Sequence, residues 1–297
     1  MLLGSFFKRV GLIDEAFSAK MNKFAFAVAL PALLFQDISA VDIRESWNGG
    51  FVLFCFIATF LSITGVTVLS FFVVKREERG EFVQGAYRSS AAILGIAFIQ
   101  NIYGTSGMAP LMIIGTVPLY NAFAVIVLSL LKPGQRKMDK ALLQKTLKGI
   151  VTNPIILGIA AGFVWAILKI PQPEILQKTV KNMAVLATPL GLMAMGASFE
   201  GKKALGKLKP TLIASALKLV VLAAIFLPMA VRLGYRESEL VAILVMLGSA
   251  TTVSSFVMAR NMGYEGILTS SIVMVTTLCS AFTLTGWLFL LKTLGLV

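Results

Sequence analysis

The sequence predicts an all-α polytopic membrane protein, and three observations support that prediction. Of its 297 residues, 57% are hydrophobic and 14% are charged, whereas soluble domains carry about 25% charged residues. The mean hydropathy is +0.86. Apolar runs close to the roughly 20 residues that a helix needs to cross a bilayer recur along the chain, which favours helices over a β-barrel.

Nine apolar runs are long enough to span a membrane, and one short run, residues 2–7, precedes them. Pro31 lies in the middle of the first long run and Pro189 inside the sixth. Each proline removes a backbone donor, so we expect a helix kink at both positions. The long runs cover residues 21–38, 49–74, 82–103, 108–131, 149–168, 175–199, 211–231, 240–259 and 267–291.

The two halves of the chain show a weak internal repeat. A shift of 158 residues aligns Pro31 with Pro189 and Glu81 with Glu239 without a gap. Chance agreement of helix lengths is the alternative, but a shared register through four helix pairs favours duplication. We therefore expect a ten-helix inverted-repeat (5+5) transporter whose first helix is truncated. Its parts would be a first repeat (1–131), a basic cytoplasmic connector (132–148) and a second, inverted repeat (149–297).

The net charge of +13 follows from membrane topology. Most Lys and Arg residues fall in loops on one side of the predicted membrane, and that side is expected to be cytoplasmic. We expect a multi-pass inner-membrane protein in a lipid bilayer, with both termini outside if ten helices are complete. Because topology accounts for the charge, no nucleic-acid partner is needed.

The residue inventory narrows the chemistry. Histidine is absent, which removes imidazole metal ligands and the commonest general base. Cys55 and Cys279 lie in apolar runs without motif spacing and are interpreted as buried thiols. An intramembrane enzyme would need a serine with Lys218 as its base, and no nucleophile motif surrounds either. We expect no enzyme, metal site or cofactor.

A cluster of hydroxyl residues lies in the run at 240–259, which includes the stretch LGSATTVSSFVMA. Polar side chains at membrane depth indicate a functional site by default. The alternative is hydrogen bonding between packed helices. Five such residues within seven positions favour the functional interpretation: Ser249, Thr251, Thr252, Ser254 and Ser255.

Two cations, Arg88 and Lys218, lie inside predicted spans, whereas all fourteen carboxylates lie in loops or at span ends. A buried cation without a buried carboxylate is costly unless an anion, a carbonyl or water compensates it. The pattern predicts transport of an anion. The alternative is that the long side chain of Lys218 snorkels and that Arg88 reaches the cytoplasmic interface.

Five motifs resemble, in order, those of the auxin efflux carrier family of membrane transporters. They are ALPALLF, YRSSAAILGIAFIQNIYG, VTNPIILGIAAG, ATPLGLMAMGASF and GSATTVSSFVMARNMG. The resemblance implies two inverted five-helix repeats, a fold shared with bile-acid symporters, and two broken helices (87–103 and 240–259) that cross at the substrate site. Bacterial members of the family include malate and malonate permeases, plant members export auxin, and the likeness implies a homodimer.

The sequence departs from the family pattern at both crossing helices. Ser90 and Ala97 replace an asparagine and a proline, and the second helix lacks a proline near Thr251. We therefore expect the breaks to depend on Gly95, Gly248 and the hydroxyl run, because glycine weakens a helix by about 1 kcal/mol.

The function predicted is a secondary carrier for small organic anions, such as malate, malonate or auxin-like weak acids, working by alternating access. The alternative is a sodium-coupled symporter with a bile-acid-symporter-like fold, in which hydroxyls and carbonyls hold the ion. The predicted substrate-binding residues are Arg88, Ser89, Ser90, Gly95, Asn101, Lys218, Ser249, Thr251, Thr252, Ser254 and Ser255.

Overall fold

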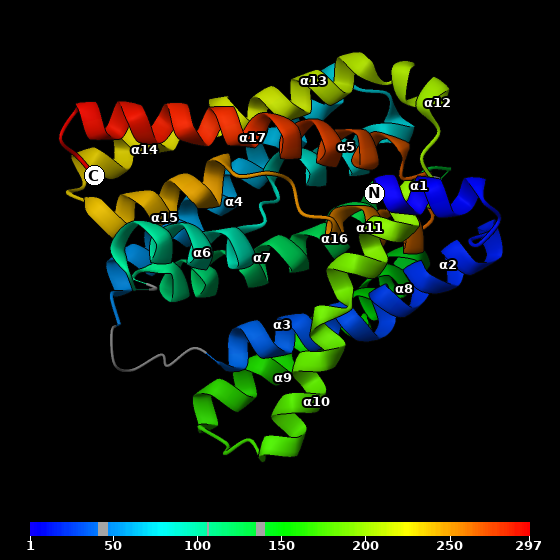
Figure 1. The fold of residues 1–297 in the computed structure, drawn as a ribbon, viewed down its shortest axis with the longest axis horizontal. Helices are drawn as coiled ribbons and strands as arrows, with labels where there is room; N and C mark the ends of the chain where they lie inside the picture. The colour runs from blue at the N-terminus through cyan, green and yellow to red at the C-terminus, as the bar shows by residue number, and fades with distance from the viewer. Residues whose placement is uncertain (41–46, 106, 135–139) are drawn as a thin grey trace.

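The computed structural model describes residues 1–40, 47–105, 107–134 and 140–297, and this part of the chain forms helices without a strand (Figure 1). Part of the basic connector, residues 135–139, lies outside it. The α-helices are α1 (Leu2–Arg9), α2 (Glu15–Phe24), α3 (Leu30–Ser39), α4 (Gly49–Val73), α5 (Arg79–Tyr87), α6 (Ala91–Tyr103), α7 (Ala109–Leu130), α8 (Lys140–Val151), α9 (Pro154–Leu168), α10 (Glu174–Val185), α11 (Ala187–Ala197), α12 (Gly201–Leu205), α13 (Leu208–Ala216), α14 (Leu222–Arg232), α15 (Glu237–Gly248), α16 (Ser254–Asn261) and α17 (Ile267–Thr293).

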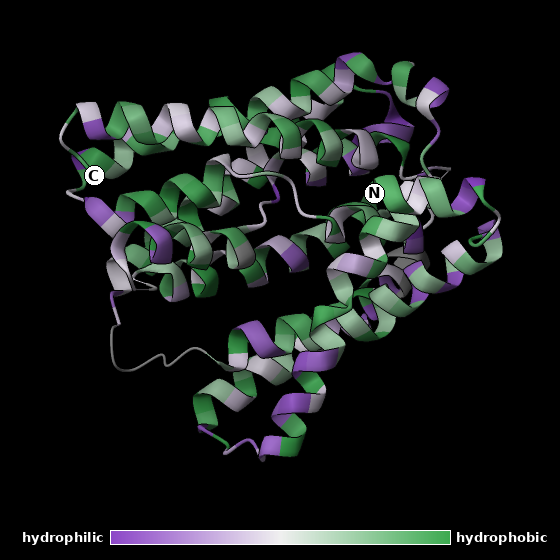
Figure 2. Cartoon of the chain, in the orientation of Figure 1, coloured by the Kyte–Doolittle hydropathy of each residue, from purple (hydrophilic) through white to green (hydrophobic). Residues whose placement is uncertain are grey.

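Six continuous helical segments within the described residues are long and apolar enough to cross a membrane. This confirms the prediction of an all-helical polytopic membrane protein. Several helices expose large apolar side chains, such as Phe72, Phe282 and Phe289, as lipid-facing surfaces do. Hydrophobic residues cover most helix bodies in Figure 2, and many hydrophilic ones lie toward helix ends and connections. The six segments are Glu15–Ser39, Gly49–Val73, Ala109–Leu130, Glu174–Ala197, Leu208–Arg232 and Ile267–Thr293.

The helices pack in two groups. In the first, α3 packs against α9 and α10, while α11 packs against α1 and α2. In the second, α4 packs against α5 and α7, α13 against α17, and α15 against α6 and α14. In Figure 1 the second group fills the upper part of the view and α3, α9 and α10 lie below it. Contacts of α16 with α2 and α11, and of α7 with α3 and α9, join the groups.

Both prolines predicted to kink helices lie just after an irregular turn. A π-helical turn, Ala25–Ala29, precedes Pro31, which lies in the first turn of α3. Leu186 separates α10 from α11, and Pro189 follows in the first turn of α11. A proline cannot donate to the carbonyl four residues before it, so the irregularity falls on the preceding turn.

The connector between the halves is partly helical. α8 begins at Lys140, within the segment predicted as a basic connector, and ends at Val151, beyond the predicted boundary at residue 149. Asn153 then caps α9, its side-chain oxygen accepting a hydrogen bond from the backbone N–H of Ile155 at 2.9 Å. The apolar run at 149–168 is therefore divided between two helices, because Pro154 is favoured in the first turn of a new helix.

Candidate functional site: two interrupted helices around a buried arginine

The run at 82–103 is interrupted at Arg88. α5 ends at Tyr87, the backbone of Arg88 is extended (φ −73°, ψ 131°), and Ser90 precedes α6. Gly95 lies inside α6, so the prediction that it helps to break this helix is wrong. A Cβ on Gly95 would lie 2.7 Å from the Met112 methyl carbon. The absence of a side chain at Gly95 leaves room for the end of the Met112 side chain of α7.

The run at 240–259 is interrupted within its hydroxyl cluster. α15 ends at Gly248, as predicted, and Ser249 is extended (φ −81°, ψ 166°). The next helix, α16, starts at Ser254, so residues 249–253 separate the two helices. Serine and threonine side chains bond to nearby backbone groups and so offer an alternative to helical hydrogen bonds. Glycine followed by this polar run interrupts the helix without a proline.

The two interruptions lie against each other and exchange hydrogen bonds. The Ser90 N–H donates to the carbonyl of Ala250 at 3.0 Å. Thr251 Oγ1 donates to the carbonyl of Gly85 at 2.7 Å, and Gln84 Nε2 donates to that of Ser255 at 2.9 Å. The bonds from Ser90 and Thr251 satisfy carbonyls at the two interruptions, where helical partners are missing.

Arg88 lies at this junction and is 2% exposed. Its Nη2 donates to Asn121 Oδ1 at 2.7 Å and to Ser254 Oγ at 2.9 Å, and its Nη1 donates to the sulfur of Met258 at 2.8 Å. These partners are neutral, and the buried Nε has no hydrogen-bond partner. The burial shows that Arg88 does not reach an interface by snorkelling.

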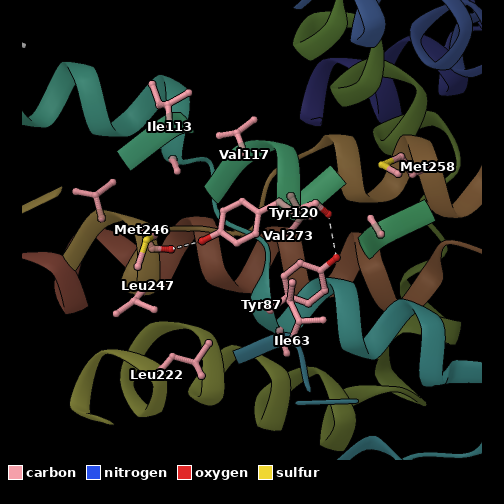
Figure 3. Packing of buried hydrophobic residues seen from close by; sticks show 14 of the residues in the cluster. Ile63, Tyr87, Ile113, Val117, Tyr120, Leu222, Met246, Leu247, Met258 and Val273 are labelled. Carbon is pink, nitrogen blue, oxygen red and sulfur yellow. Dashed lines mark hydrogen bonds between the residues drawn. The ribbon is translucent and has the colours of Figure 1, made fainter. Parts of the chain in front are cut away.

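A tyrosine pair holds the junction to α7. Tyr87 Oη donates to the carbonyl of Tyr120 at 3.0 Å, and Tyr120 Oη donates to the carbonyl of Met246 at 2.8 Å (Figure 3). Ser89 Oγ donates to the same Met246 carbonyl. Both rings are at most 3% exposed. The carbonyl end of α15 is thereby connected to the residues next to Arg88.

Lys218 reaches the same helix end from the other side. It lies in a π-helical turn, Leu217–Val221, and is fully buried. Its Nζ donates to the carbonyl of Leu247 and, at 3.4 Å, to that of Met246. A cation at the carbonyl end of a helix is favourable because the last carbonyls lack helical partners and carry partial negative charge.

A cavity of about 60 Å³ opens between the two helix groups at Arg88. Its walls include the first residues of α6, Ser254 of α16, Asn121 of α7 and Thr188 of α11. The N-terminal ends of α6 and α16 therefore meet at it. Helix N-termini carry unpaired N–H groups and positive partial charge, so the cavity suits an anion.

A carboxylate also lines this cavity: Asp37 of α3. We expected buried cations unaccompanied by any buried acid, and that expectation is wrong. Glu81 is 4% exposed and caps α17 by accepting hydrogen bonds from the backbone N–H groups of Gly266 and Thr269 at 3.0 and 2.8 Å. Both acids lie near predicted span ends, where sequence alone suggests solvent.

The predicted site residues fall into two sets. The structure brings five of them together around the cavity: Arg88, Ser89, Ser90, Thr252 and Ser254. Ser249, Thr251 and Ser255 are buried in or beside the second interruption, while Asn101 is exposed on α6. Sequence reasoning missed Asp37, Asn121 and Thr188. Asn121 was detectable as a lone amide inside the run at 108–131.

Comparison with known proteins points to transport. The chain matches a family described as "Membrane transport protein" over residues 1–288. It is also 26% identical over 281 residues to a protein of Rhizobium meliloti (strain 1021) named "Putative malonate transporter". That alignment covers 92% of this chain and 86% of the other protein.

Proposed function

Because the chain belongs to the membrane transport protein family of the auxin efflux carriers, we propose that it is a secondary carrier for small organic anions, with malonate-like dicarboxylates as the substrate class. The substrate would bind in the cavity between the two interrupted helices. Five of the predicted residues would contribute: Arg88, Ser89, Ser90, Thr252 and Ser254. A carrier of this kind is not an enzyme.

The observation that carries the proposal is the bonding of Arg88. A guanidinium in an interior site normally pairs with a carboxylate or phosphate, because a buried unpaired charge is expensive. Here the described partners are an amide, a hydroxyl and a thioether, and the buried Nε has no hydrogen-bond partner. A substrate carboxylate would complete this set of ligands, and the N-termini of α6 and α16 favour the same charge.

The size of the cavity narrows the substrate class. A cavity needs about 10–15 Å³ to hold one water molecule. The cavity of about 60 Å³ at Arg88 therefore accommodates a few heavy atoms. A three-carbon dicarboxylate needs a modest expansion, whereas an aromatic acid of the auxin type needs a much larger one. The name of the Rhizobium meliloti relative supports the smaller class.

The packing supports alternating access between two bodies. α5, α6 and α15 belong to one group and α16 contacts both groups, whereas Asp37 and Thr188 reach the cavity from the other group. A substrate bound between them would move as one group shifts against the other. The proposed inverted repeat fits the element positions: α5 begins at Arg79 and α15 at Glu237, and α7 begins at Ala109 and α17 at Ile267, so both pairs lie 158 residues apart. The inner-membrane location, the cytoplasmic basic loops and a homodimer stay predictions.

Sodium coupling is the weaker alternative. In carriers with broken helices, carbonyls at a half-helix C-terminus coordinate the ion. Here the ammonium of Lys218 donates to the Met246 and Leu247 carbonyls at the end of α15. A sodium ion at that position would have to displace it. Uptake is therefore expected to be independent of a sodium gradient.

Uptake into liposomes tests the proposal. The purified protein should give saturable accumulation of radiolabelled malonate and malate that unlabelled malonate competes away. An excess of indole-3-acetate should compete weakly. If folded protein gives no saturable transport of any of the three acids, the proposal fails.

A further inference from the structure

Two charged side chains face the cavity from opposite helix groups. Arg88 comes from the first interruption and Asp37 from α3, and among the described lining residues they are the ones that carry charge. The Asp37 side chain is half-buried. Within the described residues it forms no ion pair with Arg88, so their charged atoms are more than 4.0 Å apart. The cavity, not a salt bridge, lies between them.

This arrangement sets the charge that an entering anion meets. With Asp37 ionised, the two side chains sum to zero, and the carboxylate repels an anion a few ångströms away, where water screens poorly. With a proton on Asp37, the cavity keeps the single positive charge of Arg88, and Asp37 gains an O–H donor. One substrate carboxylate then pairs with Arg88, and the proton on Asp37 offers a hydrogen bond to the other.

We propose, resting on the proposed function, that Asp37 is the binding site of a coupling proton and that the carrier moves one proton with each organic anion. The proton binds an Asp37 carboxylate oxygen before or with the anion and leaves on the other side after the anion. Binding of each ligand favours binding of the other, because thermodynamic linkage between two sites is reciprocal.

Other titratable groups near α3 are placed differently. Tyr120 of α7 lines the same cavity, and its hydroxyl is bonded to the Met246 carbonyl. α7 and the π-helical turn before α3 carry no charged residue. Lys169, beyond α9, and Lys181 of α10 line a separate cavity with Gln36, and Glu174 pairs with Lys178. Among the described residues, Asp37 is thus the acid that an anion at Arg88 would encounter.

The experiment uses full-length protein in liposomes that contain a pH-sensitive dye. Malonate added outside at a lower external pH should enter faster than at equal pH, and the lumen should acidify in proportion to the labelled malonate taken up. At pH values above those at which Asp37 loses its proton, the affinity for malonate should fall about tenfold for each pH unit. This slope is expected when the binding of one malonate is linked to the binding of one proton. Saturable malonate uptake by the wild type without lumen acidification would overturn the inference and leave the proposed function intact. Absence of saturable uptake would overturn both.

Two variants locate the proton. Asp37→Asn should lose the stimulation by a pH gradient and the lumen acidification, and its remaining malonate exchange should become insensitive to pH. Asp37→Glu should keep both signals. The matched control is Glu174→Gln, an exposed carboxylate-to-amide change on α10, which should behave as wild type. If Asp37→Asn does not fold, the wild-type dye measurement and Asp37→Glu decide the question. Proton-coupled uptake by folded Asp37→Asn would overturn the assignment.

Discussion

Arg88 and Lys218 are both buried cations beside an interrupted helix, yet their surroundings differ. The guanidinium of Arg88 contacts side chains and borders a cavity. The ammonium of Lys218 contacts backbone carbonyls at the end of α15, and Lys218 is not among the residues that line the cavity. Burial of a positive charge therefore does not by itself indicate a substrate site. The partners of the charge show whether it is available to a ligand.

The largest expected effect is the loss of Arg88. Arg88→Gln removes the charge that would pair with the substrate, and removing one member of a buried charge pair costs about 2–5 kcal/mol. We expect malonate uptake to fall at least about a hundredfold, which corresponds to about 2.7 kcal/mol. Initial uptake rates in liposomes measure this. Lys202→Gln, on the exposed turn at α12, is the matched loss of one positive charge and should transport normally.

Lys218 should behave differently. Lys218→Met keeps a long side chain but leaves the Met246 and Leu247 carbonyls without this donor, which costs about 1–3 kcal/mol. We expect a lower melting temperature in detergent and, for the folded fraction, a KM for malonate within about twofold of wild type. An unchanged melting temperature with a KM raised tenfold would place Lys218 in the substrate site and would contradict the distinction between Arg88 and Lys218.

Two hydroxyl residues at the second interruption also differ in their partners. Ser254 Oγ accepts a hydrogen bond from Arg88, whereas Thr251 Oγ1 donates one to the Gly85 carbonyl of the crossing helix. Ser254→Ala should raise the KM several-fold with little change in stability. Thr251→Val should lower stability by about 1 kcal/mol with a smaller effect on the KM. The reverse pattern would contradict the roles assigned to these residues.

The smallest effect is expected at a cation outside the spans. Lys207 bonds to Glu78, and this hydrogen bond raises the pKa of Lys207 above its ordinary value. Because the pKa of Lys207 is higher in the folded than in the unfolded protein, the pairing stabilises the fold fully at pH values below the unfolded pKa of about 10.4. This stabilisation is lost as the pH rises through the pKa of Lys207 in the folded protein. Glu78→Gln should therefore cost at most about 1 kcal/mol at pH 7, and melting curves should show the difference shrinking above about pH 10.5. A difference that grows with pH would contradict this pairing.

The sequence was most informative where local chemistry decides structure. Gly248 followed by the hydroxyl run does end α15, and six of the nine long apolar runs correspond to continuous helical segments among the described residues. Arg88 could be recognised because burying a cation in an apolar run costs free energy whatever the run packs against. Its neighbours Ser89 and Ser90 were found with it.

The remaining features depend on tertiary packing. Gly95 was expected to break a helix, but the tight contact with Met112 is invisible in the sequence, and the break falls at Arg88 instead. Asp37 is close to the end of a span, so its sequence position suggests solvent. It reaches the cavity because α3 packs where Arg88 and Thr188 also converge. The predicted connector is partly helical, because α8 begins within it at Lys140.

An experimental structure of the protein with malonate tests most directly whether the substrate binds at Arg88. We expect density for one carboxylate against the Arg88 guanidinium, beside Ser254 and the N-terminus of α16, with the second carboxylate toward Asp37. Malonate bound elsewhere, such as in the cavity at Lys169 and Lys181, with the space at Arg88 empty, would contradict it.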